Sequence, residues 1–208
     1  GRELATSEGN PLFVGELVRM LVQDGALKRE GERWTTAVEL AHIEMPPTIQ
    51  ALLAARLDQL DTSERDVLER GAIEGRVFHR DAVQTLTPDD SQVTARLTSL
   101  VRKEFVRPDR SELPGEDAFR FRHLLVRDAA YNGLPKAARA ELHEQFADWL
   151  TEHGRDLVEL DEILGYHLEQ ACRYHAELGV TVDGSLAGEA RQRLATAGRR
   201  AMARQSEA

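Results

Sequence analysis

The sequence predicts a mainly α-helical protein that contains a small β-hairpin. Alanine, leucine, glutamate and arginine are abundant, and apolar residues recur at spacings of three and four over most of the chain. Near residues 105–122 the spacing of apolar residues shortens to two, which is typical of strands. Three helices, a two-stranded hairpin and a further helix are the element order of a winged-helix domain, which we assign to residues 61–134. Residues 1–60 precede it, and residues 135–208 form an antiparallel helical array of the tetratricopeptide-like kind.

Composition limits the classes of protein to be considered. The 208 residues can bury a sizeable core, and 41% apolar with 30% charged residues is ordinary for a soluble chain. No apolar run approaches the roughly 20 residues of a membrane span, and the first residues do not resemble a signal peptide. A single cysteine fits a reducing compartment. We therefore expect a cytoplasmic protein without a membrane partner, and the net charge of −9 argues against a large nucleic-acid surface.

The N-terminal segment, residues 1–60, is predicted to hold two helices and a small hairpin. Asn10 and Pro11 suit the cap and first position of a helix, which Gly25 ends. Residues 26–35 have the pattern of a hairpin that turns at a glycine. A second helix follows Pro47, with apolar residues at helical spacing.

The winged-helix region begins with capping signals. Asp61 with Glu64 three residues later predicts a capped helix, and a short helix is expected at about residues 79–86. The run from Thr87 to Asp90 predicts the start of the next helix, because it supplies a cap, a first-turn proline and acids at the positive dipole end. The two expected strands are residues 105–107 and residues 118–122.

The most informative position is His123, where the strand pattern changes to a helical one. His123 should open a helix, beside backbone N–H groups that lack intrahelical acceptors and at the positive end of the macrodipole. A phosphate group can bind at such a place. The alternative is a histidine that only caps or packs at a strand–helix junction.

The C-terminal array shows three apolar stripes and no residues arranged for catalysis. His167 lies on one stripe and is expected in the core, whereas His143 and His153 are expected at the surface. His167, Cys172 and His175 would spread over about 140° of a helix, too wide for one metal ion. No phosphate-binding glycine loop, nucleophile elbow or zinc-protease motif is present. We therefore predict no catalytic residue, no metal site and no enzymatic activity for this segment.

Three motifs together resemble one protein family. They are Gly9-Asn10-Pro11-Leu12-Phe13-Val14, Ile49-Gln50-Ala51-Leu52-Leu53-Ala54-Ala55-Arg56-Leu57-Asp58, and Phe121-Arg122-His123-Leu124-Leu125-Val126-Arg127-Asp128-Ala129-Ala130-Tyr131. The chain resembles the signal-transduction ATPases with numerous domains, the STAND branch of the AAA-like P-loop ATPases. The resemblance is strongest to bacterial members linked to class III adenylate or guanylate cyclases, or to LuxR-type transcriptional regulators.

The resemblance implies a nucleotide switch. Residues 1–60 would be the end of the ATPase helical lid, where Gly9 and Pro11 belong to the nucleotide-binding motif and Pro11 packs on the adenine. His123 would contact the ADP β-phosphate, although the family's Met-His-Asp pattern is replaced by arginine before and leucine after the histidine. The catalytic P-loop core would precede Gly1, so the full-length protein would be an ATPase that binds ADP or ATP, with a cyclase or a transcription factor as its effector. An unidentified protein or small molecule would bind the helical repeats, and no nucleotide is expected to bind this segment alone.

The alternative function is a DNA-binding transcriptional regulator, although DNA is not the expected partner. The helix at residues 88–103 would then read bases, with basic residues on the wing. Its polar side chains are Ser91, Arg96, Thr98, Ser99, Arg102 and Lys103, and the wing offers Arg107 and Arg110. Asp89 and Asp90 at the start of that helix would repel phosphates, which disfavours this alternative.

Overall fold

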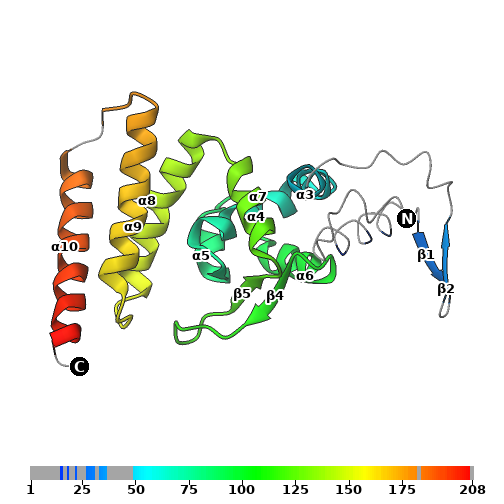
Figure 1. Ribbon diagram of the computed structural model, residues 1–208, viewed down its shortest axis with the longest axis horizontal. Coiled ribbons are helices and arrows are strands. Elements are labelled where there is room, and N and C mark those ends of the chain that lie inside the picture. Colours follow the sequence, from blue (N-terminus) through cyan, green and yellow to red (C-terminus); the bar gives the residue numbers. More distant parts are fainter. Residues whose placement is uncertain are drawn as a thin grey trace. The chain divides into compact units, whose positions relative to one another are not determined.

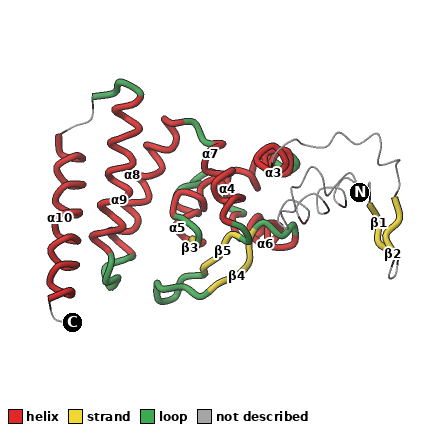
Figure 2. Tube along the Cα trace, in the orientation of Figure 1, coloured by secondary structure: helices red, strands yellow, loops and turns green. Residues whose placement is uncertain are grey.

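The computed structural model describes residues 15, 18, 22, 27–30, 33–36, 49–181 and 184–206. The chain divides into two compact units, Gly1–Asp61 and Thr62–Ala208. Helices dominate the described residues, and short strands are few, which confirms the predicted mainly α-helical class (Figure 2). Two predicted site residues, Gly9 and Pro11, lie outside the described residues.

The first unit contains a strand pair and a helix. Strands β1 (Leu27–Glu30) and β2 (Arg33–Thr36) pair in antiparallel fashion, as the sequence predicts. Helix α3 (Ile49–Asp58) carries the second motif of the family resemblance.

The second unit begins with a winged-helix topology (Figure 1). Its elements are α4 (Thr62–Glu74), β3 (Val77–His79), α5 (Arg80–Thr85), α6 (Val93–Arg102), β4 (Val106–Asp109) and β5 (Ala118–Phe121). The three strands form an antiparallel sheet in the order β3-β5-β4. The helix α4 packs against both α6 and the later helix α7 (Leu124–Gly133), so the sheet and the helices share one core.

Strand β3 corrects the prediction of a two-stranded hairpin. Phe78 pairs with Phe119 of β5, and its fully buried ring lies 5.2 Å from the ring of Phe121. A Cβ atom at Gly71 would lie 2.9 Å from the Phe78 ring, so α4 approaches β3 as closely as a glycine allows. Three residues are too few to show a strand period, so Val77 and Phe78 were assigned to no element and His79 was placed at the start of the following helix.

The start of α6 also differs from the prediction. The helix begins at Val93, not at Pro88, because polar side chains hold the preceding residues in turns. The Thr87 hydroxyl donates to the Val83 carbonyl at 2.8 Å, and the Asp90 carboxylate accepts from the Gln92 N–H at 2.7 Å. Thr87 and Asp90, which the sequence analysis took as signals of a helix start, therefore stabilise the loop that precedes α6.

A conformation that favours glycine occurs where α6 meets β4. Glu104 has φ of +60°, and the N–H groups of Glu104 and Phe105 donate back to carbonyls of α6. This turn leads directly into β4. Phe105, just before the strand, and Val106, its first residue, are both buried.

The remaining helices form an antiparallel row. They are α8 (Lys136–His153), α9 (Leu160–Glu177) and α10 (Gly184–Ser206), of which α8 packs on α9 and α9 on α10 (Figure 1). A Cβ atom at Gly165 would lie 2.7 Å from the Leu194 side chain, so α9 and α10 approach closely. None of the described helices has the length and apolar character needed to cross a bilayer.

Candidate functional site

His123 lies where the sequence predicts, between β5 and α7. It is the N-cap residue of α7, with φ of −134° and ψ of 138°, and it is half-buried. Its side chain makes no capping hydrogen bond to α7, which removes capping from the alternative explanations for this histidine. Packing at the junction remains an alternative.

The start of α7 is open to solvent. Leu124, the first helical residue, is 54% exposed, and the His123 carbonyl accepts hydrogen bonds from the N–H groups of Val126 and Arg127. The N–H groups of Leu124 and Leu125 precede the first intrahelical acceptor. This helix end can therefore offer backbone donors and the positive end of a dipole to an anion.

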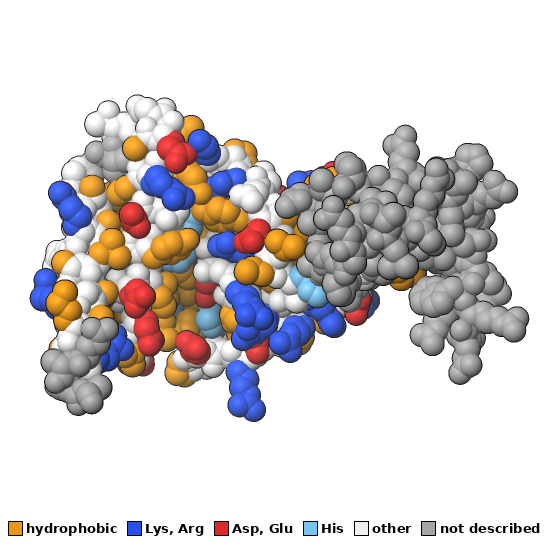
Figure 3. Space-filling view, in the orientation of Figure 1, with side chains coloured by type: hydrophobic (Ala, Val, Ile, Leu, Met, Phe, Trp, Pro, Cys, Tyr) orange, Lys and Arg blue, Asp and Glu red, His pale blue; other side chains and the backbone are white. Residues whose placement is uncertain are grey.

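Arginines line the sheet beside this helix end. The register places Arg107 of β4 opposite Arg120 of β5, and two like charges in that position destabilise a sheet. Arg120 binds the Asp109 carboxylate, and this hydrogen bond lowers the pKa of Asp109. The Arg122 guanidinium lies 3.7 Å from the Glu104 carboxylate. Figure 3 shows Lys and Arg side chains gathered on the part of the winged-helix domain where Figure 1 labels β4 and β5.

The polar face of α6 is partly occupied by acids of the protein itself. The Glu64 carboxylate of α4 accepts hydrogen bonds at 2.6 Å from both the Ser99 hydroxyl and the Lys103 ammonium group. Arg96 lies 3.5 Å from the Asp90 carboxylate. Three of the side chains that would read DNA thus have intramolecular partners, which weakens that alternative.

A buried polar network, which the sequence analysis missed, joins α7, α8 and α9. Tyr131 hydrogen-bonds through its hydroxyl to His143 at 2.8 Å and to the Tyr174 hydroxyl at 3.0 Å. The Nδ1 atoms of His143 and His167 are 2.7 Å apart. His167 is 1% exposed, as expected of a core histidine, and His153 is exposed as predicted.

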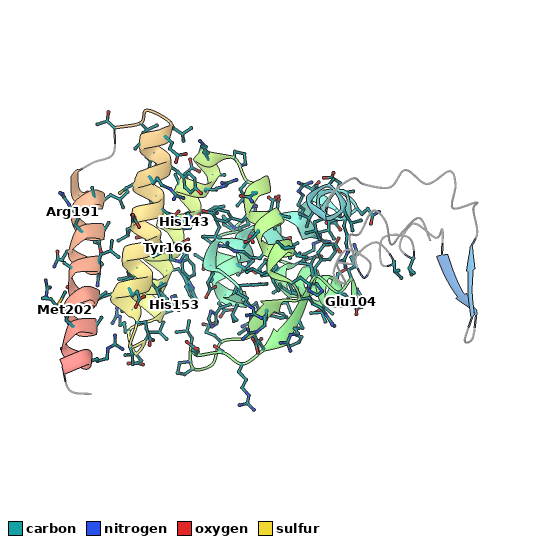
Figure 4. The ribbon with its side chains drawn as sticks, in the orientation of Figure 1. Glu104, His143, His153, Tyr166, Arg191 and Met202 are labelled. Atoms are coloured by element: carbon teal, nitrogen blue, oxygen red, sulfur yellow. The ribbon has the colours of Figure 1, made fainter. Side chains whose placement is uncertain are left out.

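His143 was wrongly predicted at the surface, because it is fully buried. The centroid of its ring lies 5.8 Å from that of Tyr131 and 6.3 Å from that of Tyr166 on α9; His143 and Tyr166 are labelled in Figure 4. A signal was available, since position 143 lies three residues from both Ala140 and Phe146 on the inward side of α8. His143 was assigned to the surface because it is polar, although its spacing places it on the buried side of α8.

Both buried histidines are neutral. Burial lowers the pKa of His143 to about 3, with a further contribution from the nearby Arg127, Arg173 and Arg139 charges. Burial also lowers the pKa of His167 well below its ordinary value. Each imidazole therefore carries one N–H donor and one acceptor nitrogen at neutral pH.

The histidine and cysteine cluster considered for a metal does not converge. His167 is in the core, whereas His175 bonds to the Glu144 carboxylate of α8 at 2.6 Å. Among the described residues, no three His, Cys, Asp or Glu side chains are placed to hold a metal ion.

Comparisons with known proteins give little guidance on function. No protein-family model matches the chain. The chain is 27% identical over 141 residues to an uncharacterized protein of Rhizobium meliloti (strain 1021). That alignment covers 67% of this chain and 13% of the relative, so the chain spans about an eighth of the length of that protein.

Proposed function

We propose that this chain is a non-catalytic regulatory module of a STAND-type ATP/ADP switch. The observation that best supports the proposal is the position of His123, at an exposed helix N-terminus that directly follows the last strand of a winged-helix sheet. The three sequence motifs support it from a separate direction. The relative's much greater length is compatible with a segment of a multidomain protein.

In the proposed resting state, an ADP molecule bridges a P-loop core, the lid and the winged helix. His123 and the first N–H groups of α7 donate hydrogen bonds to the β-phosphate, and Gly9 and Pro11 contact the base from the lid. Exchange of ADP for ATP shifts the switch only if these contacts differ between the two states. The helical array α8–α10 senses an unidentified protein or small molecule, and the effector is a cyclase or a transcription factor in the cytoplasm.

The test uses the full-length protein with its nucleotide-binding core. A hydrogen bond to a charged group contributes about 1.5–3 kcal/mol. Replacing His123 with alanine should therefore raise the Kd for ADP by about tenfold to a hundredfold, as measured by calorimetric titration. Basal signalling should rise at the same time, because the resting state is weakened.

His153→Ala is the matched control, since His153 is an exposed histidine far along α8 that should leave the Kd for ADP unchanged. An unchanged Kd in His123→Ala would remove His123 from the site. A full-length protein that binds no ADP would exclude the switch altogether.

DNA binding is the second candidate function. One observation favours it, namely that Arg107 of β4 and Arg120 of β5 lie opposite each other on the sheet. We expect no binding to a DNA duplex, because acids of the protein occupy part of the polar face of α6. The measurement is a gel shift with duplexes of mixed sequence over a range of salt. A salt-dependent shift that Arg107→Ala weakens, and that Arg191→Ala on α10 does not, would favour the DNA-binding function instead.

A further inference from the structure

The buried network connects the winged helix to the helical row. Tyr131 belongs to α7, His143 to α8, and His167 and Tyr174 to α9. Their hydroxyl and ring nitrogen atoms form a continuous chain with separations of 2.7, 2.8 and 3.0 Å. All four side chains are at most 9% exposed, so water cannot readily replace a lost partner.

Two arginines determine which atoms donate and which accept along this row of hydrogen bonds. The guanidinium groups of Arg139 and Arg173 lie 3.4 and 3.3 Å from the Tyr174 oxygen, and a guanidinium can only donate. The Tyr174 oxygen therefore accepts, and its own proton points to Tyr131. The Tyr131 proton then points to Nε2 of His143, which leaves the Nδ1 proton of His143 to bond Nδ1 of His167. Each histidine is thereby fixed in one tautomer.

Arg139 also holds the end of α7. It donates to the carbonyls of Leu134 and Asn132 at 3.0 and 2.9 Å, and its guanidinium lies 4.8 Å from the centre of the Tyr131 ring. Only Leu134 and Pro135 separate α7 from α8. The C-terminal end of α7 is thus attached to α8 by both the chain and a side chain.

We propose that the Tyr174–Tyr131–His143–His167 chain is a joint that makes the winged helix and the first two helices of the row move as one body. A shift of α7 that carries the Tyr131 hydroxyl beyond hydrogen-bond distance would break its bonds to α8 and α9 together. A partly broken network would leave buried donors and acceptors without partners, which costs more than an intact or fully opened one. The joint is therefore expected in two states, with all of its hydrogen bonds formed or with all of them open. This proposal does not depend on whether His123 binds a phosphate.

The neutral state of both histidines supports this role. Since burial keeps the pKa of His143 at about 3, mild acid does not switch the joint in the folded protein. We therefore expect displacement of α7 or of α9, rather than mild acid, to open the joint.

The first test is the tautomer of each histidine in the chain of residues 1–208, read from the side-chain nitrogen resonances of ¹⁵N-labelled protein. We expect the Nδ1–H tautomer for His143 and the Nε2–H tautomer for His167. In Tyr131→Phe, His167 should lose its single tautomer, because the two side chains are linked through His143. A purely structural role for the Tyr131 hydroxyl would leave His167 unchanged, and that result would overturn the joint. If this variant does not fold, Tyr174→Phe, which removes the arginine-fixed end, gives the same readout.

The second test is a double-mutant cycle on the folding equilibrium constant. Tyr131→Phe and His167→Phe should each lower that constant by about tenfold, and together by much less than the product of about a hundredfold. Tyr166→Phe is the control, because it removes the same atom from a 44% exposed tyrosine on α9. If the double variant lowered the folding equilibrium constant by the product of the two single effects, the proposal would be overturned. An equally large effect of Tyr166→Phe would also overturn it.

Discussion

Replacing Phe78 with alanine is expected to lower the free energy of unfolding by about 3–5 kcal/mol. The ring is fully buried between α4 and the sheet, 5.2 Å from the Phe121 ring and 6.0 Å from the Phe119 ring. Its removal leaves a cavity at the centre of the winged-helix domain. Urea unfolding followed by circular dichroism would measure the loss.

A second substitution makes this prediction specific. In the wild-type protein, Gly71→Ala should destabilise, because the added Cβ atom would lie 2.9 Å from the Phe78 ring. In the Phe78→Ala background the same methyl group enters the cavity and also favours the helix, so it should stabilise by about 1 kcal/mol. If Gly71→Ala changed the free energy of unfolding in the same direction in both backgrounds, the close packing of α4 on β3 would be contradicted.

Acid is expected to destabilise the protein through His143 and His167. The unfolded chain binds protons at these residues near their ordinary pKa of 6.5, whereas the folded protein binds them only at much lower pH. Because the unfolded state takes up more protons, the free energy of unfolding falls as the pH drops below about 6.5. Between about pH 7 and 5 the loss should be about 2 kcal/mol for each histidine.

His79 acts in the opposite direction. Burial lowers its pKa, but the hydrogen bond and charge of Glu74 outweigh burial, and the net pKa is raised. Its contribution to stability is therefore present below about pH 6.5 and is lost as the pH rises through the folded pKa. His79→Gln should steepen the fall in acid, and His143→Gln should make it shallower. A free energy of unfolding that stayed constant between about pH 7 and 5.5 would contradict the neutral buried pair.

The sequence predicted the elements whose pattern is long or whose change of period is sharp. The transition at His123 was predicted at the correct residue, because alternation over Phe119 to Arg122 stops where the helical spacing starts. Strand β3 was missed because three residues carry no period. The start of α6 was placed too early because Thr87 and Asp90, both good capping residues, also form local hydrogen bonds outside helix starts. The Thr87 hydroxyl donates to the Val83 carbonyl, and the Asp90 carboxylate accepts from the Gln92 N–H.

The candidate site divides in a similar way. The location of His123 follows from local pattern, but its phosphate contact depends on a lid that includes Gly9 and Pro11, outside the described residues. The partners within the buried network do not follow from local pattern, because a tyrosine on α7 and histidines on α8 and α9 meet only through tertiary packing. Polar residues on an apolar stripe are the signal that would have indicated it.

Glu104 occupies a backbone conformation in which an L-residue is strained and glycine is not, yet it carries a side chain. Glycine at this position would relieve that strain and would also remove the carboxylate that lies 3.7 Å from Arg122, the residue just before His123. The arginine would then be free to turn toward an incoming anion. Comparing Glu104→Gly with Glu104→Gln would therefore separate the backbone strain from the charge, because glutamine keeps the side chain and removes only the carboxylate. A gain in anion affinity in both variants would show that the Glu104 carboxylate competes with the anion for Arg122.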